Sequence, residues 1–184
     1  MRKNGLVLPL VALLAAFALF PAIAEGGGAS SAAAPGGAPA AVAPAPPAAS
    51  PLFGVTIPEG YRGWEVVAPS HRTDNNEVRV ILGNEIAMKA YRGGTLPFPD
   101  GAILAKLAWE RVESTEFKNA FVPGKPKRIE FMVKDAKKYS ATGGWGFGRF
   151  VEGKPADEAA HRTCFPCHQA NVKDHDFVFT RFAP

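Results

Sequence analysis

The sequence predicts an α+β domain, built from several β-strands and a few short helices. Segments such as 129–134 and 177–182 alternate apolar and other residues with the period of two that is typical of strands. Two other segments, 84–92 and 155–163, combine helix-capping residues or early acidic residues with helical composition. The strand patterns argue against a four-helix bundle.

The first 50 residues differ in composition from the rest. Arg2 and Lys3 precede an almost wholly apolar run that ends in small residues, so we expect residues 1–24 to be a secretory signal peptide leading to the periplasm. An uncleaved membrane anchor is the alternative. Residues 25–50 are nearly all Ala, Gly, Pro and Ser and cannot bury a core, so they are expected to be a linker, either a tether or a simple leader.

The folded domain is expected at residues 51–184, which is enough chain for one core. Removing residues 1–24 takes away Arg2 and Lys3 and no acidic residue, so the formal net charge of +4 falls to +2. The remaining basic residues are interspersed with acidic ones, a pattern typical of a solvated surface. We therefore do not expect nucleic acid among the partners.

Composition and turn residues locate the elements in order. Strands are predicted at 64–67, 77–82, 102–109, 129–134, 145–151 and 177–182. Asn84 caps a helix that stops at Gly93, and Met88 within it is expected to fill the core. Arg79 is expected to point outward from its strand. Polar loops are predicted at 71–76 and 114–126 and a polar turn at 171–175.

Positions in two of the predicted strands are candidates for a chemical role. Lys106 shares a strand face with Leu104 and Ala108, so burial is expected to lower the pKa of its amine, unless an edge position lets the ammonium reach water. Gly146 and Gly148 lie inside a strand, where glycine often marks the close approach of another group. A flat macrocycle and ordinary sheet packing are both compatible with that pattern.

Cys164 and Cys167 are the only cysteines of the chain, and His168 follows them directly. Two thiols separated by two residues can each add to a vinyl group of one porphyrin, and the next imidazole can ligate the iron. We interpret the motif as the attachment site of one covalent haem c, with His168 as the proximal ligand. A dithiol redox pair would not need the histidine. A zinc site that adds His161 or His175 would normally use two separated ligand pairs.

The chain after His168 has only sixteen residues and no methionine. His161 and His175 lie seven residues either side of His168, about 10.5 Å along a helix, so they cannot easily reach the opposite face of the porphyrin. A sixth ligand would have to come from upstream, where the options are Met88, Met132, His71 and Lys106. The simplest interpretation is a five-coordinate iron with an open position for a small diatomic or amine, which makes simple electron transfer the weakest hypothesis.

The chain from about Tyr61 to Pro184 resembles the cytochrome P460 family. The resemblance is carried by the late CxxCH motif, the closing segment 178–182, a lysine five residues after Gly101, and residues 133–135 before an aromatic-glycine strand. It implies a mainly antiparallel β domain with a few helices, one c-type haem with a histidine ligand, and a homodimer.

The resemblance also implies two possible functions. Lys106 matches a lysine that is joined covalently to the porphyrin edge in family members that oxidise hydroxylamine, and these enzymes use a distal acid as proton acceptor. Asp157 or Glu158 is the expected acid. We therefore expect hydroxylamine oxidation or another reaction of nitrogen oxides, with electrons passing to a soluble acceptor cytochrome. The alternative is a non-catalytic protein that binds nitric oxide, similar to the β-sheet cytochromes c′, with Phe98, Phe131 and Phe147 as candidate pocket residues.

Overall fold

The computed structural model describes residues 47–183, in which six strands form one antiparallel sheet. The strands are β1 (Glu65–Arg72), β2 (Glu77–Gly83), β3 (Ile103–Glu113), β4 (Phe121–Lys134), β5 (Trp145–Val151) and β6 (Lys154–Pro155). The helices are α1 (Glu85–Gly93), α2 (Glu158–Arg162) and α3 (Cys164–Val172), with 3-10 turns η1 (Tyr61–Gly63), η2 (Ser140–Thr142) and η3 (Lys173–His175). The predicted α+β class is confirmed. The predicted signal peptide and most of the predicted linker lie outside the described residues.

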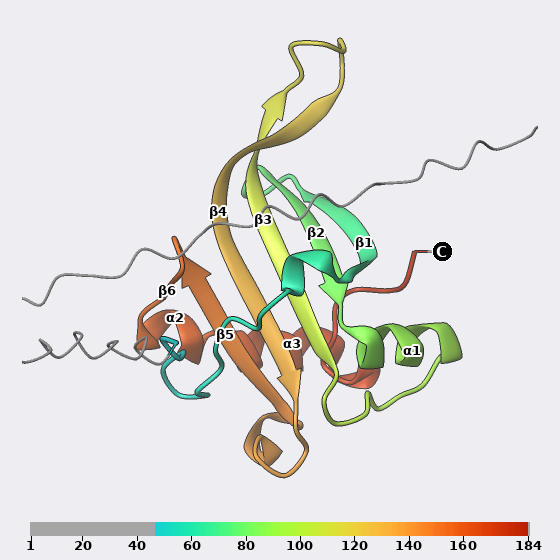
Figure 1. Ribbon diagram of the computed structural model, residues 1–184, viewed down its shortest axis with the longest axis vertical. Helices are drawn as coiled ribbons and strands as arrows, with labels where there is room; N and C mark the ends of the chain where they lie inside the picture. The colour runs from blue at the N-terminus through green and yellow to red at the C-terminus, as the bar shows by residue number, and fades with distance from the viewer. Residues whose placement is uncertain (1–46, 184) are drawn as a thin grey trace, which may run out of the picture. The chain divides into compact units, whose positions relative to one another are not determined.

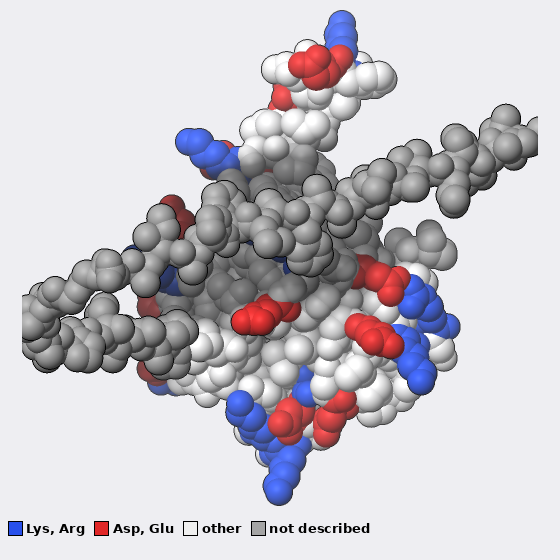
Figure 2. All heavy atoms as spheres, viewed as in Figure 1, with Lys and Arg blue, Asp and Glu red and all other residues white. Residues whose placement is uncertain are grey.

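Each strand pairs with the next one in the chain, from β1 to β6 (Figure 1). Helix α3 lies behind the sheet in this view, and η1 lies in front of it. None of the helices in residues 47–183 is long and apolar enough to cross a membrane. On the face drawn in Figure 2, the coloured basic and acidic side chains are interspersed, as the sequence pattern indicates.

Helix α1 follows its predicted boundaries because both of its ends are capped locally. The Asn84 side chain accepts a hydrogen bond from the backbone N–H of Ala87, 3.0 Å away, and satisfies a free donor of the first turn. Gly94 ends the helix in the left-handed conformation, with φ of 60°. Met88 is buried in the core, as predicted.

The sheet has a core cluster on each face, and β3 contributes to both. Leu104 packs with Val67 and Met88 on the face that α1 and α3 cover. Leu107 packs with Phe131 on the opposite face. The predicted alternation along β3 is therefore confirmed, and it leaves Lys106 on the same face as Leu104.

The prediction of a loop over the sheet at 114–126 is wrong for its second half. Strand β4 begins at Phe121, which pairs with Glu113, and the β3–β4 hairpin extends beyond the rest of the sheet (Figure 1). The prolines and glycine of 123–126 suggested a loop. The ladder accommodates them through register irregularities around Trp109, where Pro126 has no N–H to donate.

The prediction that the chain ends as a strand at 177–182 is also wrong. Asp176 and Phe177 both have positive φ, and the chain continues as irregular backbone, tied to β1 by the Ala183 N–H, which donates to the Val67 carbonyl at 3.0 Å. Val178 is buried in the core and Phe177 packs against it. Their alternation therefore reflects packing of single side chains rather than strand pairing. The predicted loop at 71–76 is shorter, because β1 continues to Arg72, and α3 and η3 occupy most of the predicted turn at 171–175.

The glycines of β5 accommodate protein side chains. A Cβ at Gly146 would lie 2.3 Å from the Tyr139 ring, and one at Gly148 would lie 2.8 Å from Val55, on the sheet face opposite α3. We expect Gly146→Ala to lower the free energy of unfolding by about 1–3 kcal/mol or more, measured by urea denaturation, because the buried ring must move. Gly63→Ala, with nothing within 4 Å, is the control. Equal stability of the two variants would contradict the close packing.

Candidate functional site

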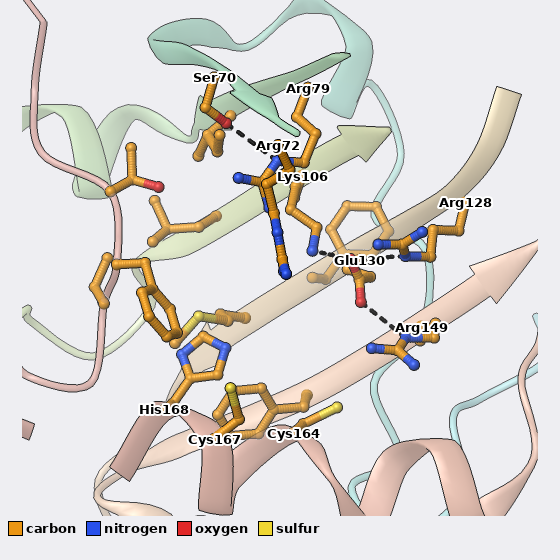
Figure 3. A pocket seen from close by; sticks show the side chains of 18 of the residues that line it. Ser70, Arg72, Arg79, Lys106, Arg128, Glu130, Arg149, Cys164, Cys167 and His168 are labelled. Carbon is orange, nitrogen blue, oxygen red and sulfur yellow. Dashed lines mark hydrogen bonds and ion pairs between the residues drawn. The ribbon is translucent and has the colours of Figure 1, made fainter. Parts of the chain in front are cut away.

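A cavity of about 970 Å³ lies between the sheet and helix α3 (Figure 3). Its walls come from strands β1 to β5, from α3 and from the C-terminal segment. The volume is at the upper end of the range for cofactor and ligand pockets. The cavity has two chemically different parts, a thiol and imidazole group on α3 and a cluster of charged side chains on the sheet.

Helix α3 brings Cys164, Cys167 and His168 to this cavity, and all three side chains line it. Residues at i, i+3 and i+4 lie on one face of a helix, so the CxxCH spacing is sufficient to place them together. Both cysteines are free thiols. Burial raises the pKa of the half-buried Cys164 thiol, which favours its protonated form.

The His168 ring is held in one orientation. Its Nδ1 lies 2.6 Å from the Phe177 carbonyl oxygen, which can only accept, so Nδ1 carries the proton and the Nε2 lone pair is available. Burial lowers the pKa of His168 and favours the neutral ring. The rings of Phe147 and Phe179 pack at centroid distances of 5.1 and 4.9 Å. An oriented neutral imidazole is the form that a metal ligand requires.

The other two histidines considered as zinc ligands make contacts within the protein. His161 is buried, its Nε2 accepts from the Arg149 N–H at 2.9 Å, and its Nδ1 lies 2.8 Å from the Asp157 carbonyl. His175 has Nδ1 3.0 Å from the Val178 carbonyl. Within residues 47–183, His, Cys, Asp and Glu side chains form no group of three that could hold a metal ion. The two contacts of His161 instead join the start of α2, through Asp157, to β5, through Arg149.

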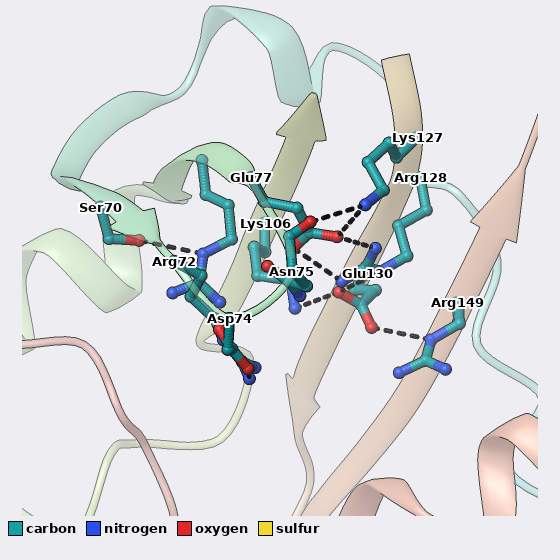
Figure 4. Close-up of polar contacts among 11 residues, drawn as sticks. Ser70, Arg72, Asp74, Asn75, Glu77, Lys106, Lys127, Arg128, Glu130 and Arg149 are labelled. Carbon is teal, nitrogen blue, oxygen red and sulfur yellow. Dashed lines mark hydrogen bonds and ion pairs between the residues drawn. The ribbon is translucent and has the colours of Figure 1, made fainter. Parts of the chain in front are cut away.

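The charged part of the cavity is centred on Glu130. Glu130 on β4 stands directly opposite Lys106 on β3 in the strand register, and the two side chains form an ion pair (Figures 3 and 4). The Arg149 Nε donates to Glu130 at 2.8 Å and the Arg128 Nε donates to it at 3.3 Å. All four residues line the cavity.

These neighbours keep Glu130 ionised. Burial opposes the charge of the carboxylate, but the attraction and hydrogen bond of Lys106, with the charges of Arg149 and Arg128, lower its pKa to about 2. Burial lowers the pKa of Lys106 despite the attraction of Glu130, in the direction that the strand pattern predicts. The pair therefore has a firmly deprotonated acid beside an amine that gives up its proton more readily than a free lysine.

A second buried carboxylate supports the first. Glu77 on β2 is fully buried, and both its oxygens pair with Arg128 while Lys127 lies 3.0 Å away (Figure 4). Burial opposes its ionisation, and the hydrogen bonds from Arg128 and Lys127 outweigh burial and lower its pKa. Arg128 is thus fixed between Glu77 and Glu130. Sequence patterns did not single out either acid.

Arg79 differs from its predicted outward orientation. It lines the cavity, its Nε donates to the Ser70 hydroxyl at 3.1 Å, and burial lowers its pKa (Figure 3). The strand pattern placed it on one face but could not show that a cavity lies there.

The structure does not bring the predicted distal acids to the cavity. Asp157 caps α2 by accepting from the Ala160 N–H at 2.8 Å, and Glu158 is exposed and pairs with Arg162. Neither side chain lines the cavity. Glu130 is the carboxylate found there. The alternation of 129–134 could have indicated it, since it separates Glu130 from the apolar face that includes Phe131.

The candidates for a sixth ligand divide into two pairs. Lys106 and Met132 line the cavity, whereas Met88 is in the core and His71 is exposed, stacked on Phe121.

The predicted pocket aromatics divide similarly. Phe147 lines the cavity, whereas the Phe131 ring packs with Leu107 and Phe150 in the core on the opposite face of the sheet. Phe98 packs against Trp145 and Tyr91 in the core. Because the Phe147 ring packs against His168, it lies on the imidazole side of the cavity.

Comparison with known protein families matches residues 58–180 to the family described as Cytochrome P460, which is more than half of the chain. The match includes every strand and helix of the described residues, together with the CxxCH motif. No curated protein matches the chain.

Proposed function

The chain belongs to the cytochrome P460 family of haem cytochromes, and from this premise we propose that its cavity holds one haem c. Cys164 and Cys167 would form the thioethers and His168 would ligate the iron. The observation that carries this proposal is that α3 directs two free thiols and an oriented neutral imidazole into one cavity of about 970 Å³. The residues present therefore fit the group that the family implies.

We propose further that the protein oxidises hydroxylamine. Haem supplies a site for the substrate nitrogen and an acceptor for its electrons. The first oxidation of hydroxylamine, to nitroxyl, releases two electrons and two protons. Glu130 is the group that would take a proton, because its carboxylate lines the cavity in the ionised form, and loss of the Lys106 charge through a bond to the haem would raise its low pKa and make it a stronger base. Arg149 and Arg128 hold that carboxylate in place, and a soluble acceptor cytochrome would take the electrons.

Lys106 is proposed to contact the haem edge, where its amine could be joined to a porphyrin carbon. Forming that C–N bond releases one proton from the amine, one proton from the carbon and two electrons in total, so it requires a two-electron oxidant such as a peroxide. The burial of Lys106 in the cavity wall and its lowered pKa support an available amine. The bond would also remove the positive charge closest to Glu130.

Replacing Lys106 with methionine is therefore expected to raise the pKa of Glu130 above its value of about 2. The attraction of the ammonium disappears and the effect of burial, which favours the neutral acid, remains. Infrared spectra recorded against pH would show the protonated carboxyl band at higher pH in Lys106→Met, and Glu130→Gln would identify that band. Lys127→Met removes an ammonium that pairs with Glu77, and it is the matched control. The comparison uses wild-type protein whose intact mass shows that Lys106 is not joined to the porphyrin, because the bond would itself remove the charge. An identical titration of that protein and Lys106→Met would contradict the coupling.

The second candidate is a nitric oxide-binding protein without turnover. The apolar residues on the cavity face of the sheet favour it, since Ile81, Leu104 and Met132 would limit access of water. For both candidates the proposed compartment is the periplasm and the proposed assembly is a homodimer.

Holoprotein matured in the periplasm separates these functions. Its intact mass would show the covalent haem, and the reduced absorption spectrum, compared with that of Lys106→Ala, would show whether the amine modifies the porphyrin. Hydroxylamine-dependent reduction of an artificial acceptor would support the enzyme. Tight nitric oxide binding without this reduction would support the binding protein, and a low-spin resting spectrum would indicate a sixth ligand and electron transfer.

A further inference from the structure

The turn between η3 and the C-terminal segment has a strained backbone. Asp176 and Phe177 have φ values of 47° and 63°. Positive φ is uncommon for residues other than glycine, and two in succession persist only when surrounding contacts hold them. The contacts at this turn come from β4, β5 and the loop before β3.

A buried ion pair anchors the turn. The Lys134 Nζ lies 2.8 and 2.9 Å from the two carboxylate oxygens of Asp176, and the side chains are only 5% and 7% exposed. The Phe98 N–H donates to the same carboxylate at 2.8 Å, and the Trp145 Nε1 donates to the Asp176 carbonyl at 2.7 Å. Side chain and backbone of Asp176 are therefore both fixed.

The anchored turn presents one backbone group to the haem-binding helix. The Phe177 carbonyl, one residue after Asp176, accepts the hydrogen bond from the His168 Nδ1 at 2.6 Å. The Phe177 ring fits beside Gly143, where a Cβ would lie 2.1 Å from it. Phe177 is therefore held in place by the packing of its ring against Gly143 and by the contacts of the residue before it, Asp176.

We propose that the Lys134–Asp176 ion pair is a positioning element for the proximal haem ligand, which holds the Phe177 carbonyl against the Nδ1 of His168. The hydrogen bond at Nδ1 sets the orientation of the ring and increases electron donation from Nε2. This inference rests on the proposed role of His168 as the iron ligand. The inference assigns a role to Lys134, the lysine within residues 133–135. It also assigns one to Asp176 and Phe177, which directly precede residues 178–182.

A contribution to the free energy of unfolding does not by itself explain why the Lys134–Asp176 ion pair is buried here. Removing two charges from water is costly, and a buried pair contributes no more than well-packed apolar side chains of similar volume. What apolar side chains could not do is accept the Phe98 N–H and hold the turn at positive φ. The geometry of the turn is therefore the property that depends on the pair.

Ferrous holoprotein provides the test, because the iron–histidine stretching band in resonance Raman spectra reports the hydrogen bond at Nδ1. We expect Asp176→Asn and Lys134→Met to lower the frequency of this band and to raise the reduction potential. The double variant should show the same shift as either single one, since each single change removes the whole pair. Lys134→Arg keeps the charge and should restore most of the wild-type frequency.

Two further variants distinguish an effect on the position of the Phe177 carbonyl from a general loss of stability. Phe150→Leu weakens the core on the opposite face of the sheet and should lower stability without moving the band. Trp145→Phe removes the hydrogen bond to the Asp176 carbonyl together with part of a buried ring that lies beside the Lys134 ammonium, and it should shift the band in the same direction if the charge variants do not fold.

An unchanged band in the folded, haem-containing variants would overturn the inference, and so would an equal shift in Phe150→Leu. Either result would leave the proposed haem site intact as long as wild type shows an iron–histidine band. Wild-type protein that matures without haem would instead overturn the proposed function, and the inference with it.

Discussion

Holoprotein in which Cys164 and Cys167 are both replaced with alanine is expected to release its haem into acidified acetone, whereas the wild-type protein should retain it. The two thiols line the same cavity as His168 and are the only cysteines of the chain, so no other thioether can form. Acid protonates the imidazole and removes the remaining bond to iron. Extraction spectra and intact masses measure the effect, which should approach complete loss.

Each single cysteine variant should keep the haem through one remaining thioether and so distinguish attachment from binding. Asn171→Ala is the control on the same helix, because its side chain is exposed and bonds mainly to the Cys167 carbonyl. Haem that is extractable from wild type, or a wild-type mass without the tetrapyrrole, would contradict c-type attachment at this motif.

Glu130→Gln is expected to lower kcat for hydroxylamine oxidation by about 10²- to 10⁴-fold, the usual contribution of a positioned proton acceptor. Glutamine keeps the shape of the side chain, but its single carbonyl oxygen can accept from only one of Arg149 and Arg128, which donate to different oxygens of Glu130, and it cannot take up a proton. Steady-state reduction of an artificial acceptor measures the loss, and KM should change less than kcat.

Glu158→Gln provides the comparison for this prediction. Glu158 is exposed and pairs with Arg162 on the surface of α2, so its substitution should leave the rate within about twofold of wild type. If Glu158→Gln lost activity and Glu130→Gln did not, the acid named from the sequence would be the proton acceptor, and Glu130 would be only the partner of Lys106.

The parts of the site that sequence could predict are those set by neighbours in the chain. The spacing of Cys164, Cys167 and His168 places them on one helix face wherever that helix packs. The caps Asn84 and Gly94 define α1 through local bonds. The alternation of β3 assigns Lys106 to a face without knowledge of the adjacent strands.

The parts that sequence could not predict depend on pairing between distant segments. Glu130 becomes the partner of Lys106 only because β3 and β4 align in one register, and 123–126 looked like a loop until that register accommodated its prolines. The resemblance indicates Asp157 or Glu158 instead, and neither lines the cavity. The apolar alternation of 177–182 is equally compatible with a strand and with an irregular segment whose side chains fill separate pockets.

The chain-order arrangement of β1 to β6 also has a consequence for biogenesis. Each strand finds its partner a short distance back along the polypeptide, so closing the ladder costs little loop entropy and should be fast. The cysteines come after the last strand in the order of synthesis. We therefore expect the sheet side of the cavity to be able to form before the segment that carries the CxxCH motif takes its place against it.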